Sequence, residues 1–323
     1  MKKTLQFAAL AGGAALILAG CASAEQPASD PAGSAAQTAP AGPRVAVAYE
    51  GGVLVLGGDD YENLGEFDSE DFIRLNSAGD GRHVMVTTSK GFQLLDVQQP
   101  ELTDLVVPAD TAGHVVSHAG KTVLYDDATS DTTIFDSAEL AKTSDALPKA
   151  EVIPGVTAHH GVSVELEDGT LLTTVGDESG RTGIRVLDED RNEIAANDEC
   201  PGVHGEGTAK DEVVVFGCEN GALVVKNGEI TKLTSPDEYG RMGNAYVSEN
   251  SPLVVMDYKD DPDAEGYLLR NITLIDTEAN TLEKVALPDG VEYTYRGVGR
   301  GPDAEAVLIG TDGKLHSIDP ATG

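Results

Sequence analysis

The feature that most constrains the fold is a strand-rich pattern that recurs from Arg44 to Gly323 with a period of about 40 residues. Each copy contains a strand, a polar turn, a second strand rich in Val, Leu and Ile, another turn, and a strand that ends in Asp. The strand that ends in Asp is the clearest part of the pattern, and it occurs at Gly91–Val97, Thr132–Ser137, Gly183–Asp190, Asn271–Glu278 and Lys314–Thr322.

Repeats of this length that consist of strands are typical of β-propellers, in which each repeat forms one blade. The repeated segment predicts an all-β protein with one propeller domain at residues 44–323 and about seven blades, with six or eight as alternatives. A jelly roll or a β-sandwich also uses many short strands, but neither explains the repeat.

The N-terminal segment has the pattern of a bacterial lipoprotein signal peptide at residues 1–21. Two lysines precede an apolar stretch at Phe7–Leu18, which is short for a membrane-spanning helix. The sequence LAGC that ends at Cys21 resembles a lipobox, whose cysteine is lipidated and becomes the mature N-terminus. The alternative is an ordinary secretory signal that is cut near Ala22–Ala24.

Residues 22–43 are rich in Ala, Pro, Ser, Gln and Gly and have no hydrophobic periodicity. Such a composition buries too little apolar surface to offset the entropy lost on ordering, so it predicts a disordered tether. Together with Cys21, the tether predicts an exported domain that a lipid anchor holds on the extracytoplasmic side of the cell membrane.

The charge of the chain limits its partners. With 55 acidic and 22 basic residues, the formal net charge is −33. A surface of this sign repels nucleic acid and anionic membrane surfaces. It favours solubility, and a second interpretation is that its field gathers cations such as Zn²⁺.

Two cysteines remain when Cys21 is assigned to the lipid. Cys200 and Cys218 form an even pair in an exported chain, which favours a disulfide bond. Zinc ligation by the two thiolates is the alternative, because Cys200 lies close in sequence to His204. A disulfide at this place pins the loop that carries His204.

Three histidines occupy the same position in three consecutive repeats. The repeats are Ala112–Tyr125, Ala158–Thr173 and Gly202–Val215, and their histidines are His114, His160 and His204. Each precedes or begins an expected innermost strand, so in a propeller the three imidazoles point at the central axis from one end. We therefore predict that these three residues form a metal site.

Zinc suits such a site best, because three neutral imidazoles leave a fourth position for water, a carboxylate or a ligand from a partner. Calcium and magnesium prefer shells of oxygen atoms, whereas copper is not separated from zinc by affinity alone. His118, His159 and Glu206 are the second choices as ligands. Each single histidine also has the simpler interpretation of a hydrogen bond to the backbone or to a nearby Asp.

Two other functional classes remain open at this point. A metal-dependent hydrolase or lyase would use a zinc-bound water, with Glu206 as base. A metal-free scaffold would bind protein or peptidoglycan through its acidic rim. The chain has no G-x-S-x-G motif, no P-loop and no G-x-G-x-x-G after a strand, which argues against serine hydrolases and nucleotide-binding enzymes.

The run ECPGVHGEGTAKDEVVVFGCENGALVV at Glu199–Val225, with AHHGVSVELEDG at Ala158–Gly169, resembles the AztD-type zinc metallochaperones of bacteria. The resemblance covers most of the domain, and its most specific part is the arrangement of Cys, His, Gly-Glu and Cys. It implies an extracytoplasmic β-propeller, not an enzyme, that binds Zn²⁺ through histidines and delivers it to the zinc-specific solute-binding protein of an ABC importer. A monomer is expected.

The chain departs from that family in one respect. The family is associated with a flexible His-rich motif near the mature N-terminus, whereas Ala22–Pro43 contains no histidine. A secondary zinc site in the tether is therefore not expected.

Overall fold

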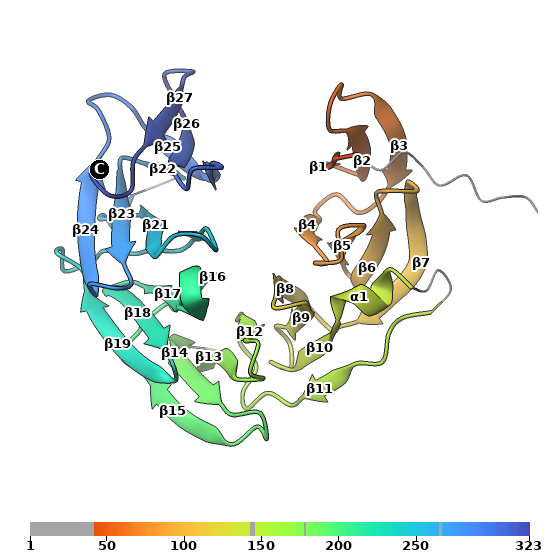
Figure 1. Cartoon of the computed structure of the whole chain (residues 1–323), viewed down its shortest axis with the longest axis horizontal. Coiled ribbons are helices and arrows are strands. Elements are labelled where there is room, and N and C mark those ends of the chain that lie inside the picture. Colours follow the sequence, from red (N-terminus) through yellow and green to blue (C-terminus); the bar gives the residue numbers. More distant parts are fainter. Residues whose placement is uncertain (1–41, 143–145, 178, 265–266) are drawn as a thin grey trace, which may run out of the picture. The chain divides into compact units, whose positions relative to one another are not determined.

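Seven antiparallel sheets follow one another around a central axis in this computed structural model, as Figure 1 shows. The structure describes residues 42–142, 146–177, 179–264 and 267–323, within the compact unit Ala39–Gly323. The sheets are the blades of a β-propeller, which confirms the predicted fold class and the predicted number of seven. The signal peptide, Cys21 and nearly all of the tether lie outside the described residues.

The first three blades contain eleven strands. Blade 1 comprises β1 (Arg44–Tyr49), β2 (Gly52–Gly57) and β3 (Asn63–Asp68). Blade 2 comprises β4 (Arg74–Ser77), β5 (His83–Thr88), β6 (Gly91–Asp96) and β7 (Glu101–Pro108). Blade 3 comprises β8 (Ala112–His118), β9 (Lys121–Asp126), β10 (Thr132–Asp136) and β11 (Glu151–Ile153), with the one-turn helix α1 (Ser137–Leu140) after β10.

The other four blades have four strands each. Blade 4 comprises β12 (Ser163–Glu165), β13 (Leu171–Asp177), β14 (Gly180–Leu187) and β15 (Glu193–Asn197). Blade 5 comprises β16 (His204–Thr208), β17 (Val214–Cys218), β18 (Gly221–Lys226) and β19 (Glu229–Thr234), with the short 3-10 helix η1 (Lys210–Glu212) after β16.

Blade 6 comprises β20 (Ala245–Tyr246), β21 (Leu253–Tyr258), β23 (Asn271–Asp276) and β24 (Thr281–Ala286). Blade 7 comprises β22 (Leu268–Leu269), β25 (Tyr293–Arg300), β26 (Ala306–Gly310) and β27 (Leu315–Ile318). The short strand β22 lies in the chain between two strands of blade 6 but pairs with β25, so it links the last two blades.

The core lies between the blades, because alternate residues of a strand point to opposite faces of its sheet. In β17, Val214 and Phe216 pack toward blade 4, whereas Val215 packs toward blade 6. Both faces of this strand are therefore buried, which explains its unbroken apolar sequence VVF. The outermost strands have one wetter face and a mixed sequence, as in β19 (EITKLT).

Six buried apolar clusters fill the spaces between consecutive blades, from blades 1 and 2 to blades 6 and 7. Among the described residues, none of these clusters joins blade 7 to blade 1. Val45 and Val47 of blade 1, and Ile309 and Leu315 of blade 7, are exposed. The described part of the chain includes no helix with the length and hydropathy needed to cross a bilayer.

Candidate metal centre

His114, His160 and His204 converge at the axis from blades 3, 4 and 5. Their Nε2 atoms are 3.4 Å apart for His114 and His160, and 3.2 Å apart for each of the other two pairs. His114 lies in β8, His160 precedes β12, and His204 begins β16. In the described residues these three side chains form the one group of His, Cys, Asp or Glu with spacing suitable for a metal ion.

The spacing of the three nitrogens fits zinc. Zn–N bonds of about 2.0–2.1 Å at tetrahedral angles place the ligand nitrogens about 3.3 Å apart. Three imidazoles with this spacing occupy three corners of the tetrahedron and leave the fourth open. The three side chains are only partly buried, and that of His160 is 38% exposed, so a ligand from solution can reach the open corner.

We call His114, His160 and His204 the trio. The hydrogen bonds on the outer side of their rings determine which ring nitrogen faces the axis. Nδ1 of His160 lies 2.6 Å from Oδ2 of Asp127, and Nδ1 of His204 lies 2.6 Å from the carbonyl oxygen of Gly243. A carboxylate and a carbonyl only accept, so each Nδ1 carries the proton and donates it. In this tautomer the Nε2 atoms of the two rings direct lone pairs at each other from 3.2 Å, an arrangement that a cation between them stabilises.

Burial keeps two of the imidazoles neutral. It lowers the pKa of His204 to about 4, an effect that the neighbouring His160 reinforces and the hydrogen bond to Gly243 opposes. Burial, followed by the charges of His204 and His160, lowers the pKa of His114 well below its usual 6.5. At pH 7 both rings are in the neutral form that binds a metal.

A glycine next to each histidine shapes the backbone at the site. A Cβ on Gly113 would lie 2.2 Å from Oδ1 of Asp127, and one on Gly161 would lie 2.3 Å from the hydroxyl of Thr174. Gly205 has φ +67°, and a Cβ there would lie 2.6 Å from a backbone nitrogen. The pairing of β8 with β9 and of β16 with β17 also shifts at these points, as at β-bulges, which commonly re-aim a side chain.

The predicted second choices lie elsewhere. Nε2 of His118 donates to Oε1 of Glu212 at 2.6 Å, so this histidine is engaged in a pairing between blades 3 and 5. Burial raises the pKa of Glu206 to about 7, and its carboxylate accepts a hydrogen bond from Thr208. No hydrogen bond joins Glu206 to the trio in the described part of the chain, so the structure does not engage this carboxylate with the three imidazoles.

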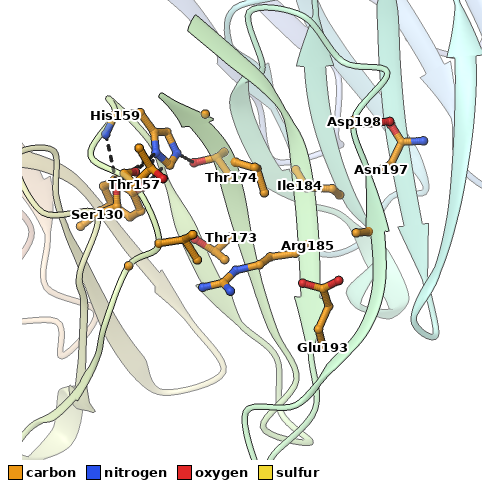
Figure 2. A pocket seen from close by; sticks show the side chains of 16 residues that line it. Ser130, Thr157, His159, Thr173, Thr174, Ile184, Arg185, Glu193, Asn197 and Asp198 are labelled. Carbon is orange, nitrogen blue, oxygen red and sulfur yellow. Dashed lines mark hydrogen bonds between the residues drawn. The ribbon is translucent and has the colours of Figure 1, made fainter. Parts of the chain in front are cut away.

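His159 points away from the trio into a pocket of about 250 Å³ between blades 3 and 4, shown in Figure 2. Its Nδ1 donates to the carbonyl of Thr157 at 2.8 Å. Its Nε2 accepts from the hydroxyls of Tyr125 and Thr174, each at 3.0 Å. Both ring nitrogens are therefore occupied, and the simpler structural interpretation holds for this histidine.

Asp127 is a site residue that sequence reasoning missed, and it provides a test of the site. We expect Asp127→Asn to weaken zinc binding by about tenfold, because a neutral amide polarises His160 less than a carboxylate does. Competition with a chromogenic chelator measures the effect. Asp136→Asn is the matched control, since this exposed carboxylate of the same blade pairs with Lys121 at 3.2 Å. Equal loss in both variants would show that the general charge of the blade, not the contact with His160, controls affinity.

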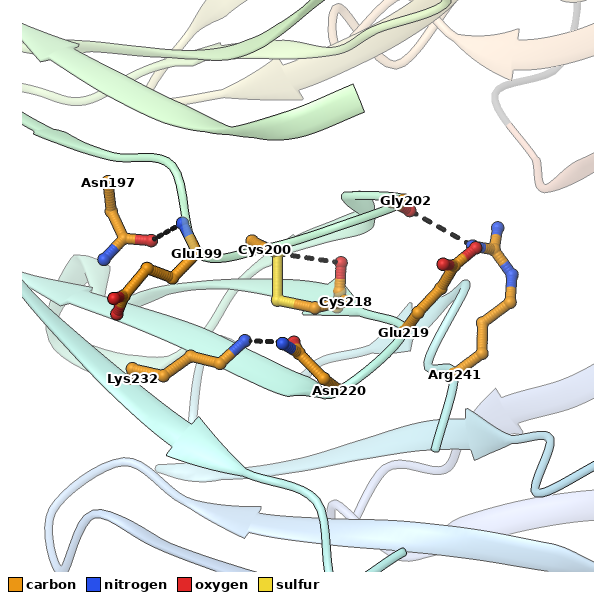
Figure 3. The surroundings of a disulfide bond; sticks show 10 residues. Asn197, Glu199, Cys200, Gly202, Cys218, Glu219, Asn220, Lys232 and Arg241 are labelled. Carbon is orange, nitrogen blue, oxygen red and sulfur yellow. Dashed lines mark hydrogen bonds and ion pairs between the residues drawn. A yellow bond between two sulfur atoms is a disulfide. The ribbon is translucent and has the colours of Figure 1, made fainter. Parts of the chain in front are cut away.

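Cys200 and Cys218 form the predicted disulfide bond, with their Cα atoms 4.9 Å apart. Figure 3 shows that the bond joins β17 to the segment that precedes β16. Both cysteines are fully buried in the cluster between blades 4 and 5, next to Val203. The disulfide therefore fixes the segment that leads into His204.

Lys232, also drawn in Figure 3, provides a test of the electrostatics around the disulfide. Burial lowers its pKa to about 8, although Glu199 opposes the shift. The unfolded chain then holds the proton more tightly than the folded protein between about pH 8 and pH 10.5, so stability rises with pH across this window. We expect Lys232→Gln to raise the free energy of unfolding at pH 7 by about 1 kcal/mol, because it removes a half-buried charge.

Urea unfolding of both proteins at pH 7, 8.5 and 10 checks this expectation. The amide of Gln retains a donor for Asn220, whose side-chain oxygen now accepts from Lys232 at 2.5 Å. The difference between the two proteins should shrink as the pH rises. A difference that stays constant over this range contradicts a lowered pKa.

The fold and the converging imidazoles define a β-propeller with a candidate zinc site, and comparisons with known proteins point to the same class. No family model matches the chain. The zinc chaperone AztD of Citrobacter koseri is 25% identical over 238 residues, which cover 71% of this chain and 53% of that protein. The match thus spans about half the length of the curated relative.

Solved structures share the propeller fold. The structure of apo AztD from Citrobacter koseri superposes with a TM-score of 0.69 at 21% identity, covering 87% of this chain and 79% of that one. A chain of the mitotic checkpoint complex superposes with a TM-score of 0.60 at 14% identity, covering 85% and 84%. The curated relative agrees with the resemblance noted in the sequence, and the AztD structures show that the propeller fold is shared.

Proposed function

We propose that the protein is an extracytoplasmic zinc metallochaperone that binds Zn²⁺ at His114, His160 and His204 and delivers it to the zinc-specific solute-binding protein of an ABC importer. The observation that carries the proposal is the convergence of three Nε2 atoms at 3.2–3.4 Å, two of them with their protons fixed on Nδ1. The similarity to a protein named zinc chaperone supports the same function.

The site is suited to exchange of the metal. Three protein ligands hold zinc while the open corner receives a ligand from the acceptor, so the metal need never be free during transfer. The partial exposure of the trio gives an acceptor access. We propose transfer without catalysis, because Glu206, the carboxylate expected to act as a base, has no hydrogen bond to the trio among the described residues.

The proposed location is the outer side of the cell membrane, with a lipid on Cys21 as the anchor. The disulfide supports an oxidising compartment, where such bonds persist. Labelling with a radioactive fatty acid tests the anchor: label on the wild type that Cys21→Ala lacks is the expected result, and label on both contradicts it.

Transfer of zinc tests the function. The purified protein, loaded with one equivalent of Zn²⁺, is mixed with the zinc-free solute-binding protein or with a chelator of equal affinity. We expect transfer to the solute-binding protein to speed up with its concentration and to exceed the rate of release to the chelator. A rate that equals spontaneous release at every acceptor concentration would contradict a chaperone, even if zinc binding itself is tight.

A further inference from the structure

A second cavity opens beside the trio, toward blades 6 and 7. Its volume is about 470 Å³, and His204 forms part of its wall. The charged groups that line it come from blades 4, 5 and 6 and from the segments between them. They are the cations Arg181, Arg241 and Lys259 and the anions Glu219 and Asp257. We call this cavity the cationic pocket.

The anions of the cationic pocket are already engaged. Asp257 is buried, and its carboxylate accepts from the backbone N–H groups of Gly243 and Asn244 at 2.6 and 2.7 Å. It thereby holds the turn whose carbonyl oxygen orients His204. Glu219 pairs loosely with Arg241 at 3.6 Å, and the same guanidinium donates to the carbonyl of Gly202 at 3.1 Å, as Figure 3 shows.

The guanidinium of Arg181 is left without a direct partner. Among the described residues it makes no hydrogen bond or ion pair, although the residue is partly buried at the start of β14. Burial and then the neighbouring Arg241 lower the pKa of this guanidinium, whereas the charges of Glu219 and Asp127 raise it without a direct contact. The positive charge of Arg181 also reaches the trio, where it helps to lower the pKa of His114 and His204.

This arrangement is unusual in a chain with a net charge of −33. Acidic residues are abundant, yet none in the described part of the chain forms a direct ion pair with Arg181, which lines a cavity instead. A half-buried guanidinium without a partner is destabilising, and zinc on the trio adds two further positive charges. The pocket is therefore built to receive an anion beside the metal.

We propose that the cationic pocket binds a carboxylate, held by Arg181, that occupies the open corner of the zinc on the trio. A carboxylate oxygen is an ordinary fourth ligand for zinc, and the planar fork of a guanidinium fits a carboxylate with two parallel hydrogen bonds. The inference rests on the proposed function, because it requires zinc on the three histidines. It adds the chemistry of the fourth ligand and a positioning role for Arg181.

The carboxylate can come from two sources with the same chemistry. A small dicarboxylate from solution fits a cavity of this size. An Asp or Glu side chain of the acceptor protein inserts in the same manner during transfer. The two sources predict different behaviour in buffer without free carboxylate. Arg181 then contributes to zinc transfer only if the acceptor protein supplies the carboxylate.

Zinc affinity measured with and without succinate tests the proposal. Succinate in solution competes weakly for zinc, so on its own it lowers the apparent affinity of any protein. We expect instead that saturating succinate raises the zinc affinity of the wild type by about tenfold, the factor that corresponds to one charge-assisted hydrogen bond. Arg181→Gln should lose this rise, and its zinc affinity without succinate should be no lower than that of the wild type, because a cation near the three histidines is removed. Arg185→Gln, four residues along the same strand and lining the other pocket, should keep both.

The outcomes separate the two proposals. If the wild type binds no zinc without succinate, the proposed function fails and the inference fails with it. If zinc binds tightly and succinate gives no rise, or gives the same rise in Arg181→Gln, the pocket proposal alone is overturned. If succinate does raise the affinity, zinc transfer to the solute-binding protein is then measured in succinate-free buffer. Slower transfer from Arg181→Gln than from the wild type identifies the acceptor protein as a source of the carboxylate. Equal transfer from the two proteins identifies a free carboxylate from solution.

Discussion

Replacing any one of His114, His160 or His204 by alanine should weaken zinc binding by a factor of about one hundred to one thousand. Structural zinc sites with four ligands bind with an apparent 10–16 kcal/mol, so one ligand contributes roughly 2.5–4 kcal/mol. The loss should be similar for all three positions, because each supplies one nitrogen at the same spacing. Chelator competition measures the affinity, and circular dichroism confirms that each variant folds.

His316→Ala is the matched control for these variants. His316 lies in β27 of blade 7, far along the sequence from the trio. Its Nε2 atom lies 3.1 Å from Oδ1 of Asp312. We expect its zinc affinity to equal that of the wild type. If the three alanine variants also bind like the wild type while remaining folded, the metal lies elsewhere and the assignment of the trio is wrong.

Removal of the disulfide should cause the largest loss of stability. Cys200 and Cys218 close a loop with a sequence separation of 18, and cross-linking a loop of this size stabilises a protein by about 3 kcal/mol. For a domain of this length that corresponds to a fall in Tm of roughly 6–12 °C in the double variant Cys200→Ala, Cys218→Ala. Alanine leaves no polar group in the buried site, so the comparison reports the cross-link and a small loss of packing.

Thermal unfolding of the wild type in a reducing agent provides the control for the disulfide. Reduction should lower the Tm by a similar amount without any change in sequence. Zinc affinity should fall less than in the histidine variants, because the disulfide fixes the segment leading into His204 but supplies no ligand. A double variant whose Tm matches that of the oxidised wild type would refute the stabilising role.

The propeller was predictable because each blade repeats the same local pattern of strands and turns. Strands such as β6 (GFQLLD) and β23 (NITLID) have both faces largely buried between blades, so they are mainly apolar and end in Asp. The sequence repeat did not predict outer strands such as β7 and β24. One face of each is exposed to solvent, so their composition resembles that of a loop. The segment after β10 begins with the single helical turn α1, for which the strand repeat gives no signal.

The trio was predictable because its histidines recur at one place in the repeat, whereas their supporting groups do not recur. Asp127 follows a strand as many turn acids do, and Gly243 acts through its backbone, which carries no sequence signal. A glycine adjacent to each histidine was a usable sign that the backbone approaches a neighbour closely. Arg181 was not foreseeable, since its role depends on which acidic residues the fold places near it.

The three histidines are separated by 46 and 44 residues along the chain, so they meet only when three blades have folded. The unfolded chain has no comparable site, so zinc bound at the proposed site would shift the folding equilibrium by about 2.7 kcal/mol when free zinc is one hundred times the Kd. Proteases cut the unfolded form, so the loaded protein outlives the empty one. The amount of the folded protein then becomes a record of how much zinc has recently been available.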